Sequence, residues 1–289
     1  MREKFEISGV DSTATDLSQY VSIFEEYGVV VFRGFFAKDT NFWNYYNDIK
    51  ELALTIAKKH GVEINRALTL NRILTILSET NRDEVGNLYD LGTRPIKLLS
   101  GVQLKSCPTI TNFVKSIMGD AALLGFPYLG ETLHIFPPGI ENTKYNLPMH
   151  QDYPYIMQSP QQITAYINLG ELQAENNGGI RVWAGSHKDG ISPSTIAEGK
   201  HRVTTNKDYF QDNYKSYDIS FDVGDFAVFD SLLQHEGIRN LSNCSRVVQL
   251  VRYSNLMNDT SISYSWKSTD PRNSKGIKFE DVHSFRDLN

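Results

Sequence analysis

Cysteine is scarce in this sequence, with Cys107 and Cys244 the only two among 289 residues. Two cysteines are too few for the disulfide framework of a small secreted domain, so we expect a chain that works in a reducing compartment. Apolar runs are short as well, and none approaches the roughly 20 residues needed to cross a bilayer. The charged residues 1–6 are not followed by the apolar core of a signal peptide. These absences predict a cytoplasmic protein without a membrane partner.

An excess of positive charge is also absent. Lys and Arg number 29 against 34 Asp and Glu, which gives a formal net charge of -5. Sequence-independent binding of nucleic acid depends on cations that neutralise phosphates, so we expect no nucleic-acid partner. The hydrophobic fraction of 40% and the charged fraction of 22% are ordinary for a globular protein with a sizeable core. We therefore expect one domain over residues 1–289.

The first 127 residues are predicted to be mostly helical, with one early strand. Apolar residues recur at helical spacing up to residue 27, and Gly28 follows where a helix would end. A β-branched run at 29–32 then predicts a buried strand. Asp39 or Thr40 can cap a second helix that ends near residue 60. Beyond it we expect two further apolar helical faces, at 70–77 and 110–117. Between them we expect a polar loop at 87–95.

From residue 128 the apolar pattern changes from helical spacing to alternation, which predicts β-strands. Residues 187–216 are polar and aperiodic, which is typical of a surface insertion, here a candidate lid. Strands at this spacing with Gly-rich turns favour a barrel or a sandwich. Alternation predicts three sets of residues that share a face: Thr132, His134 and Phe136; Ile163, Ala165 and Ile167; Thr164, Tyr166 and Asn168. The other expected strands are 180–184, 217–222, 227–230, 237–240 and 246–253.

Three residues have the composition of an iron-binding triad. His150 and Asp152 are two apart, so on a strand both side chains point to one face. His235 lies far downstream in an apolar stretch, and a barrel can return it to the same place. Two imidazoles and one carboxylate leave open positions on a metal, which suits Fe(II) that must bind a co-substrate and dioxygen. We expect these three residues to be both the metal ligands and the catalytic centre.

The motifs around the triad resemble those of the phytanoyl-CoA dioxygenase (PhyH) family of Fe(II)/2-oxoglutarate oxygenases. The resemblance covers most of the chain. It implies a mainly β fold with flanking helices, in which a double-stranded β-helix (a jelly-roll, cupin-like barrel) spans residues 128–257 and is followed by a tail at 258–289. It also implies Fe(II), 2-oxoglutarate as co-substrate, and O2. The resembling motifs besides the triad are residues 27–36, the Gly178-Gly179 turn, Gly185-Ser186-His187, Val223-Gly224-Asp225 and residues 252–254.

The resemblance assigns the co-substrate carboxylate to Arg246, which lies eleven residues after His235. A forked guanidinium is well suited to a buried carboxylate. Alternation places Arg252 on the same strand face as Arg246. The family often carries Ser or Thr two residues after the distal histidine to assist this carboxylate, and here that position is Gly237. The missing hydroxyl must therefore come from elsewhere or from water.

The residue at position 152 bears on the type of reaction. Related halogenases replace the carboxylate with Gly or Ala so that chloride can bind, and Asp152 blocks that route. We therefore expect hydroxylation of a small polar metabolite with release of succinate and CO2; desaturation, cyclisation and epimerisation stay open. We also expect that Asp152→Gly would leave an unsupported pocket that holds chloride poorly. Candidate substrate residues on the same strands and next to the triad are Tyr153, Tyr155, Tyr166, Asn168, Arg181, Trp183 and Arg252.

Two other functions fit parts of the pattern. Oxidative demethylases of nucleic acids share the His-x-Asp, the distal His and an arginine pair spaced like Arg246 and Arg252, although the acidic balance of the chain opposes this reading. The other alternative is a barrel protein that binds metal but catalyses no reaction. The presence of all four residues, the triad and Arg246, opposes the second alternative.

Overall fold

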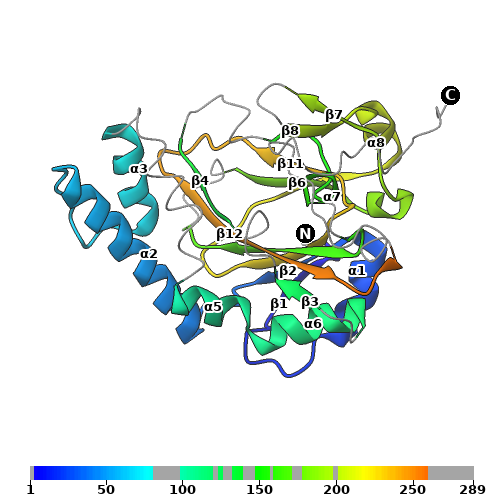
Figure 1. Cartoon of the computed structure of the whole chain (residues 1–289), viewed down its shortest axis with the longest axis horizontal. Coiled ribbons are helices and arrows are strands. Elements are labelled where there is room, and N and C mark those ends of the chain that lie inside the picture. The colour runs from blue at the N-terminus through cyan, green and yellow to red at the C-terminus, as the bar shows by residue number, and fades with distance from the viewer. Residues whose placement is uncertain are drawn as a thin grey trace.

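A computed structural model describes residues 3–80, 98–119, 123–125, 132–138, 147–156, 159–170, 178–197 and 201–259. The loop expected at 87–95 and nearly all of the tail expected at 258–289 lie outside these residues. The described chain forms three layers: helices, a large sheet and a small sheet (Figure 1). The site of interest lies between the two sheets.

The large sheet has seven strands, and the small sheet has three. In the large sheet β1 (Glu6–Ser8), β2 (Val29–Arg33), β10 (Phe226–Asp230), β5 (Gln162–Asn168), β12 (Arg246–Asn255) and β3 (Leu123–Gly125) follow in that order, and β4 (Thr132–Phe136) also pairs with β12. In the small sheet the order is β11 (His235–Ile238), β6 (Gly179–Trp183) and β9 (Ser216–Ile219). A separate hairpin pairs β7 (Ser194–Ala197) with β8 (His201–Thr204).

The helices of the N-terminal part cover the outer face of the large sheet (Figure 1). Two predicted boundaries are confirmed. Gly28 ends α1 (Val21–Tyr27) in the left-handed conformation with φ 73°, and Asp39 caps α2 (Thr40–Lys59) by accepting a hydrogen bond from the Phe42 N–H at 2.8 Å. The helices in this layer are η1 (Ser18–Tyr20), α1 (Val21–Tyr27), α2 (Thr40–Lys59), α3 (Leu70–Thr80), α5 (Leu99–Lys105) and α6 (Pro108–Met118).

Strand alternation divides the apolar side chains into two cores, as predicted for residues 162–169. Ile163 and Ile167 of β5 pack with the helical layer, whereas Tyr166 packs toward the small sheet. Ile180 and Val182 of β6 belong to the same inner cluster as Tyr166. The two sheets therefore face each other, and inward positions of β5, β12 and β4 line the space between them.

The expectation of a mainly β barrel needs correction. The fold is mixed α/β, because the helices form a full layer against the large sheet. Within the described residues, hydrogen bonds do not close the sheets into a barrel, and the sheets are joined by packed side chains instead. Strand β2 pairs with β10, which places the early part of the chain in the same sheet as the later strands. The division at residues 127/128 and 257/258 stays a prediction.

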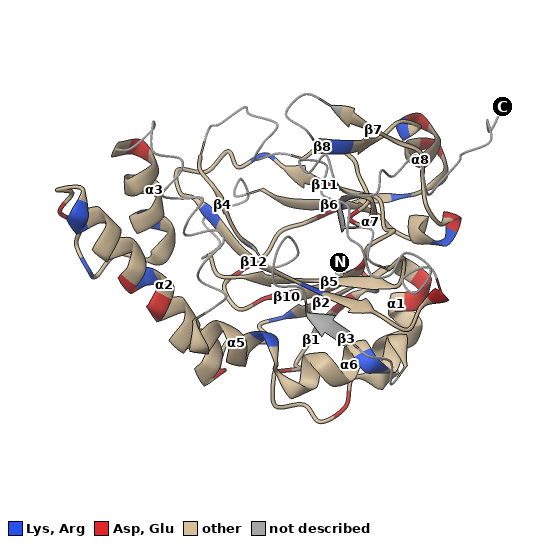
Figure 2. Cartoon of the chain, viewed as in Figure 1, with Lys and Arg blue, Asp and Glu red and all other residues tan. Residues whose placement is uncertain are grey.

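The predicted surface insertion at 187–216 contains more regular structure than expected. It comprises most of η3 (Ser186–Asp189), the β7–β8 hairpin and α8 (Lys207–Asn213). No helix in the described part of the chain is long and apolar enough to span a membrane. Lys and Arg residues lie on separate elements and are mixed with Asp and Glu residues, as on α2 (Figure 2).

Asp230 at the end of β10 gives a prediction about stability. Burial raises the pKa of this carboxyl from 3.8 to about 7, although its Oδ1 accepts a hydrogen bond from the Leu232 N–H. The folded state therefore binds a proton that the unfolded state releases, so this group lowers stability increasingly as pH rises from about 4 to 7. Asp230→Asn should be more stable than the natural chain by on the order of 2 kcal/mol at pH 8, with the difference vanishing near pH 4. Urea unfolding at several pH values, with the exposed Asp212→Asn as control, measures this; a difference independent of pH would contradict it.

Candidate metal centre

The two histidines are brought together by the backbone. The His150 N–H donates to the His235 carbonyl at 2.9 Å, and the His235 N–H donates to the His150 carbonyl at 3.0 Å. Residues that exchange both hydrogen bonds lie directly opposite each other, so their side chains share a face. The two ring centroids are accordingly 4.2 Å apart.

The expected strand through His150 and Asp152 is only partly present. His150 forms an isolated bridge, Asp152 lies in a bend, and the short helix α7 (Tyr153–Ile156) begins immediately afterwards. Pro154 supplies the physical reason, because it has no N–H for a ladder and fits the first turn of a helix. The bend still directs both side chains to one centre, so the expected convergence is present in a different local structure.

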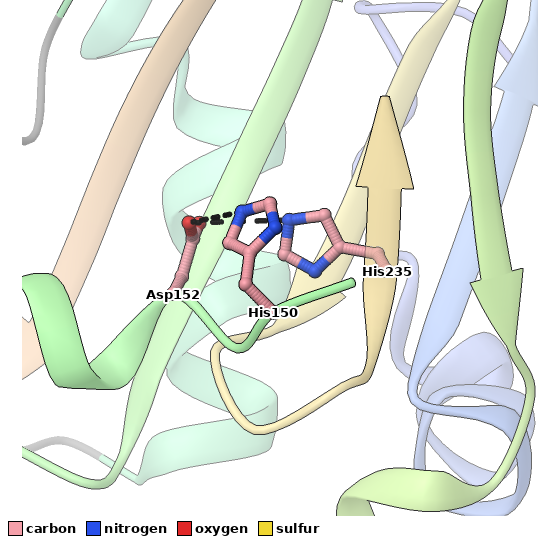
Figure 3. A group of neighbouring side chains, drawn as sticks. All are labelled: His150, Asp152 and His235. Atoms are coloured by element: carbon pink, nitrogen blue, oxygen red, sulfur yellow. Dashed lines mark ion pairs between the residues drawn. The ribbon is translucent and has the colours of Figure 1, made fainter. Parts of the chain in front are cut away.

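Asp152, His150 and His235 point toward one another (Figure 3). One ligand atom from each lies within 4.8 Å of the others, and the Asp152 Oδ1 is 3.9 Å from the Nε2 atom of each histidine. All three side chains are buried. This grouping of His, Asp and His satisfies the distance requirement for ligands of one ion.

Hydrogen bonds at the far side of each ring direct Nε2 toward the centre. The Nδ1 atom of His150 lies 2.7 Å from the Pro148 carbonyl, and that of His235 lies 2.9 Å from the Leu233 carbonyl. A carbonyl can only accept, so Nδ1 carries the hydrogen and Nε2 keeps its lone pair for a metal. Burial lowers the pKa of His150 to about 3 and also lowers that of His235, which keeps both rings neutral.

Arg252 and Thr164 fix the carboxylate of Asp152. The Arg252 Nε and Nη2 atoms lie 3.0 to 3.1 Å from the Asp152 oxygens, and the Thr164 hydroxyl donates to Oδ2 at 2.6 Å. Burial alone would raise the pKa of Asp152, but the charge and hydrogen bonds of Arg252 hold it well below its usual range. Arg252 therefore contacts the expected metal ligand Asp152 directly. Thr164 was not among the candidate site residues, although it lies opposite Arg252 in the β5–β12 ladder.

Arg246 is a buried cation near the opposite end of the inner face. Its Nη1 atom donates to the carbonyls of Gly179 and Ile238 at 3.1 and 2.9 Å, and its guanidinium lies 4.1 Å from the centroid of the Phe136 ring. Its Nε atom is buried and has no hydrogen-bond partner among the described residues. Burial lowers the pKa of Arg246, and no carboxylate in the described part of the chain pairs with it. A buried guanidinium in this condition fits an anionic ligand.

Tyr166 offers a second unpaired group on the inner face that also carries Arg246. Its ring stacks on Phe221 at 4.4 Å, and its hydroxyl is buried without a partner among the described residues. Burial raises the pKa of Tyr166, while the positive charge of Arg246 acts in the opposite direction. A carboxylate could accept from both. The sequence grouped Tyr166 with possible substrate residues and gave no signal that its hydroxyl would be buried without a partner among the described residues.

His134 is a further inner residue that the sequence reasoning did not select. It lies on β4 opposite Val248 and shares a face with Phe136, as alternation predicted. Burial and the charges of Arg252 and Arg246 lower the pKa of His134 to about 4, so the ring is neutral. Its position between the two arginines makes it a candidate for contact with a ligand of this site.

Several candidate substrate residues lie elsewhere. Arg181 and Trp183 do share one face of β6, but it is the outer face, because Ile180 and Val182 occupy the inner one. Arg181 forms ion pairs with Asp218 and Glu236 there, and Trp183 packs with Met149 and Phe210. We therefore remove both from the candidate site.

The remaining substrate candidates are Asn168, Tyr153 and Tyr155. The Asn168 amide donates to the carbonyls of Gly170 and Phe221, so this side chain connects the end of β5 to neighbouring loops. Tyr153 is fully buried at the start of α7. The side chain of Tyr155 lies outside the described part of the structure.

Two neutral imidazoles and one anchored carboxylate, buried between two facing sheets, define a mononuclear non-haem iron centre. The family profile described as "Phytanoyl-CoA dioxygenase (PhyH)" matches residues 24–248, and the chain belongs to this family. The protein is a 2-oxoglutarate-dependent non-haem iron oxygenase with a His-Asp-His facial triad. No curated protein sequence matches it significantly.

Solved structures of related enzymes have the same fold at low identity. The carbocyclase SnoK from nogalamycin biosynthesis is 16% identical with a TM-score of 0.57, covering 85% of this chain and 86% of its own. The epimerase SnoN, solved with Fe3+, alpha ketoglutarate and nogalamycin RO, is 11% identical with a TM-score of 0.58 over 90% and 92% of the chains. EctD from S. alaskensis, solved with 2-oxoglutarate and 5-hydroxyectoine, is 13% identical with a TM-score of 0.54 over 98% and 87%. These matches identify the two facing sheets as a jelly-roll.

Proposed function

We propose that this enzyme oxidises, by hydroxylation, a small polar metabolite at the His150, Asp152 and His235 centre, with release of succinate and CO2. The observation that carries the proposal is the pair of buried, unpartnered donors, the Arg246 Nε and the Tyr166 hydroxyl, on the same inner surface as the triad. A 2-oxo dicarboxylate that chelates the metal has a second carboxylate, and these donors suit it. Tyr166 then supplies the hydroxyl that Gly237 lacks.

Each residue has a separate task in this proposal. His150, Asp152 and His235 would hold Fe(II), while Arg246 and Tyr166 would bind the far carboxylate of 2-oxoglutarate. When bound, the iron and its co-substrate supply the oxidising chemistry with dioxygen, which belongs to the metal and not to the protein. The chain contributes neutral imidazoles, a carboxylate kept ionised by Arg252, and an enclosed apolar wall that includes Val248 and Phe229.

Hydroxylation is the reaction that a retained carboxylate favours. Arg252 and Thr164 hold Asp152 at the metal centre, so a bound ion would keep its remaining positions for the co-substrate and dioxygen and would have none for a halide. Cyclisation, desaturation and epimerisation begin with the same removal of hydrogen from the substrate. The substrate's own geometry selects among these outcomes.

The test of the proposed function begins without any substrate. Anaerobic addition of Fe(II) and 2-oxoglutarate together should produce a visible charge-transfer band that neither produces alone. Air should then yield succinate, and a screen of small polar metabolites by mass spectrometry should find one that speeds succinate formation and gains one oxygen. A chain that binds Fe(II) but shows no band and no succinate with 2-oxoglutarate would overturn the proposal.

A further inference from the structure

Each metal-binding loop carries a buried glutamine next to its histidine. Gln151 lies between His150 and Asp152, and Gln234 directly precedes His235. Both glutamine side chains are almost fully buried, with 2% and 0% exposure, and their hydrogen bonds run away from the metal centre. A buried amide retains its position only when its donors and acceptor are satisfied, so the partners of these groups are informative.

Gln151 connects the first metal-binding loop to the second and to the following segment. Its Nε2 atom donates to the Leu232 carbonyl at 2.6 Å, just before His235, and to the Gly190 carbonyl at 2.8 Å. Its Oε1 atom accepts from the Ser192 N–H at 2.9 Å. All the hydrogen-bonding groups of the amide therefore have partners.

Gln234 makes the equivalent connection from the second loop. Its Nε2 atom donates to the Ser192 hydroxyl at 2.9 Å, and its Oε1 atom accepts from the Thr204 hydroxyl at 2.6 Å. Its backbone N–H donates to the Ser186 hydroxyl at 2.9 Å. Ser192 thus bonds both glutamines, one through its N–H and the other through its hydroxyl.

We infer that this network, formed by Gln151, Gln234, Ser186, Ser192 and Thr204, positions the two histidine-bearing loops relative to each other. Every contributor from the 186–204 segment is buried. This part of the predicted insertion is therefore held against the metal-binding loops, and does not behave as the lid expected from its sequence. Ser192, Gln234 and Gln151 are positioning residues, because they contact the loops that carry the ligands and not the ion.

The physical reason lies in the alternation of side chains along each loop. His150, Asp152 and His235 project to the inner side, so their neighbours Gln151 and Gln234 project to the other side, beneath the same backbone. Loss of one partner leaves a buried amide unsatisfied and lets the loop move to find another. Partners that orient metal ligands typically contribute 10- to 100-fold to metal affinity. The inference rests on the metal site of the proposed function, but not on its co-substrate or substrate.

The chain offers two matched pairs of variants for a test. Ser192→Ala removes a networked hydroxyl, whereas Ser194→Ala removes a buried hydroxyl that has no partner among the described residues. Thr204→Val removes the second networked hydroxyl, whereas Thr205→Val removes an exposed one, whose hydrogen bond within the described residues goes to the Pro193 carbonyl. Mn(II) and Co(II) affinities would be measured calorimetrically on the full chain, at a temperature where circular dichroism shows each variant folded.

We expect Ser192→Ala and Thr204→Val to weaken both metals by about 10-fold or more and to shift the Co(II) absorption bands, which report ligand geometry. Their controls should remain within about twofold of the natural chain. Lower melting temperatures with unchanged metal affinity and unchanged Co(II) bands would overturn the inference, and if Ser192→Ala does not fold, Thr204→Val decides it. A natural chain that binds metal but makes no succinate would count against the proposed function alone.

Discussion

Arg246→Ala is expected to weaken the binding of 2-oxoglutarate by about 30- to 5,000-fold while leaving the affinity for Mn(II) nearly unchanged. Removal of a charged partner from a desolvated carboxylate costs on the order of 2 to 5 kcal/mol. The loss should be large because the Arg246 guanidinium is buried and its Nε has no other partner among the described residues. The metal ligands are not touched. Calorimetric titration of the Mn(II)-loaded protein under anaerobic conditions measures both affinities.

Two variants sharpen this result. Arg181→Ala removes an arginine of the outer face, whose partners are Asp218 and Glu236, and should leave co-substrate affinity within about twofold. Tyr166→Phe removes only the hydroxyl that is buried without a partner among the described residues, and should weaken 2-oxoglutarate binding by about 10- to 150-fold, the usual range for one hydrogen bond to a charged group. Equal losses of metal and co-substrate affinity in Arg246→Ala would instead indicate a damaged fold.

Asp152→Gly is expected to lose metal affinity by at least about 100-fold and to regain much of it in formate. The sequence alone suggested that the pocket would be unsupported without the carboxylate, but the structure shows two supports, Arg252 and Thr164. Removal of Asp152 takes away the carboxylate that accepts from both, and breaking a buried ion pair by removing one member destabilises a fold by about 3 to 5 kcal/mol. A small anion can occupy the vacated position and bind the guanidinium and the metal together.

The measurement is Mn(II) affinity and melting temperature of Asp152→Gly across a formate series, repeated with chloride. Formate should restore Mn(II) affinity by about 10-fold or more and raise the melting temperature. Chloride should do so more weakly, because a single atom lacks the two oxygens with which a carboxylate can meet the guanidinium and the metal at once. The double variant Asp152→Gly with Arg252→Met should show no rescue. Rescue that persists in the double variant would show that Arg252 is not the anion's partner. A rise in the Mn(II) affinity of the natural chain with chloride would contradict the assignment of Asp152 to that position on the metal.

The sequence was sufficient for features that depend on near neighbours or on residue type. Gly28 and Asp39 mark helix ends because capping is a local matter, and both were confirmed. The identity of the triad followed from His150, Asp152 and His235 themselves, because few residue sets have the chemistry that Fe(II) needs. Alternation also predicted correctly which residues of β5 and β12 share a face.

The tertiary structure decided which of two faces is the inner one, and which distant residues meet. Alternation groups Arg181 with Trp183 but does not say whether that face lies inside, and the packing of Ile180 and Val182 placed it outside. Arg252 and Asp152 are 100 positions apart, so no local pattern signals their contact. The same holds for Ser192, whose contacts with Gln151 and Gln234 span 41 and 42 positions. Short-range spacing fixes what shares a strand face, whereas the docking of two sheets and one insertion determines what that face contacts.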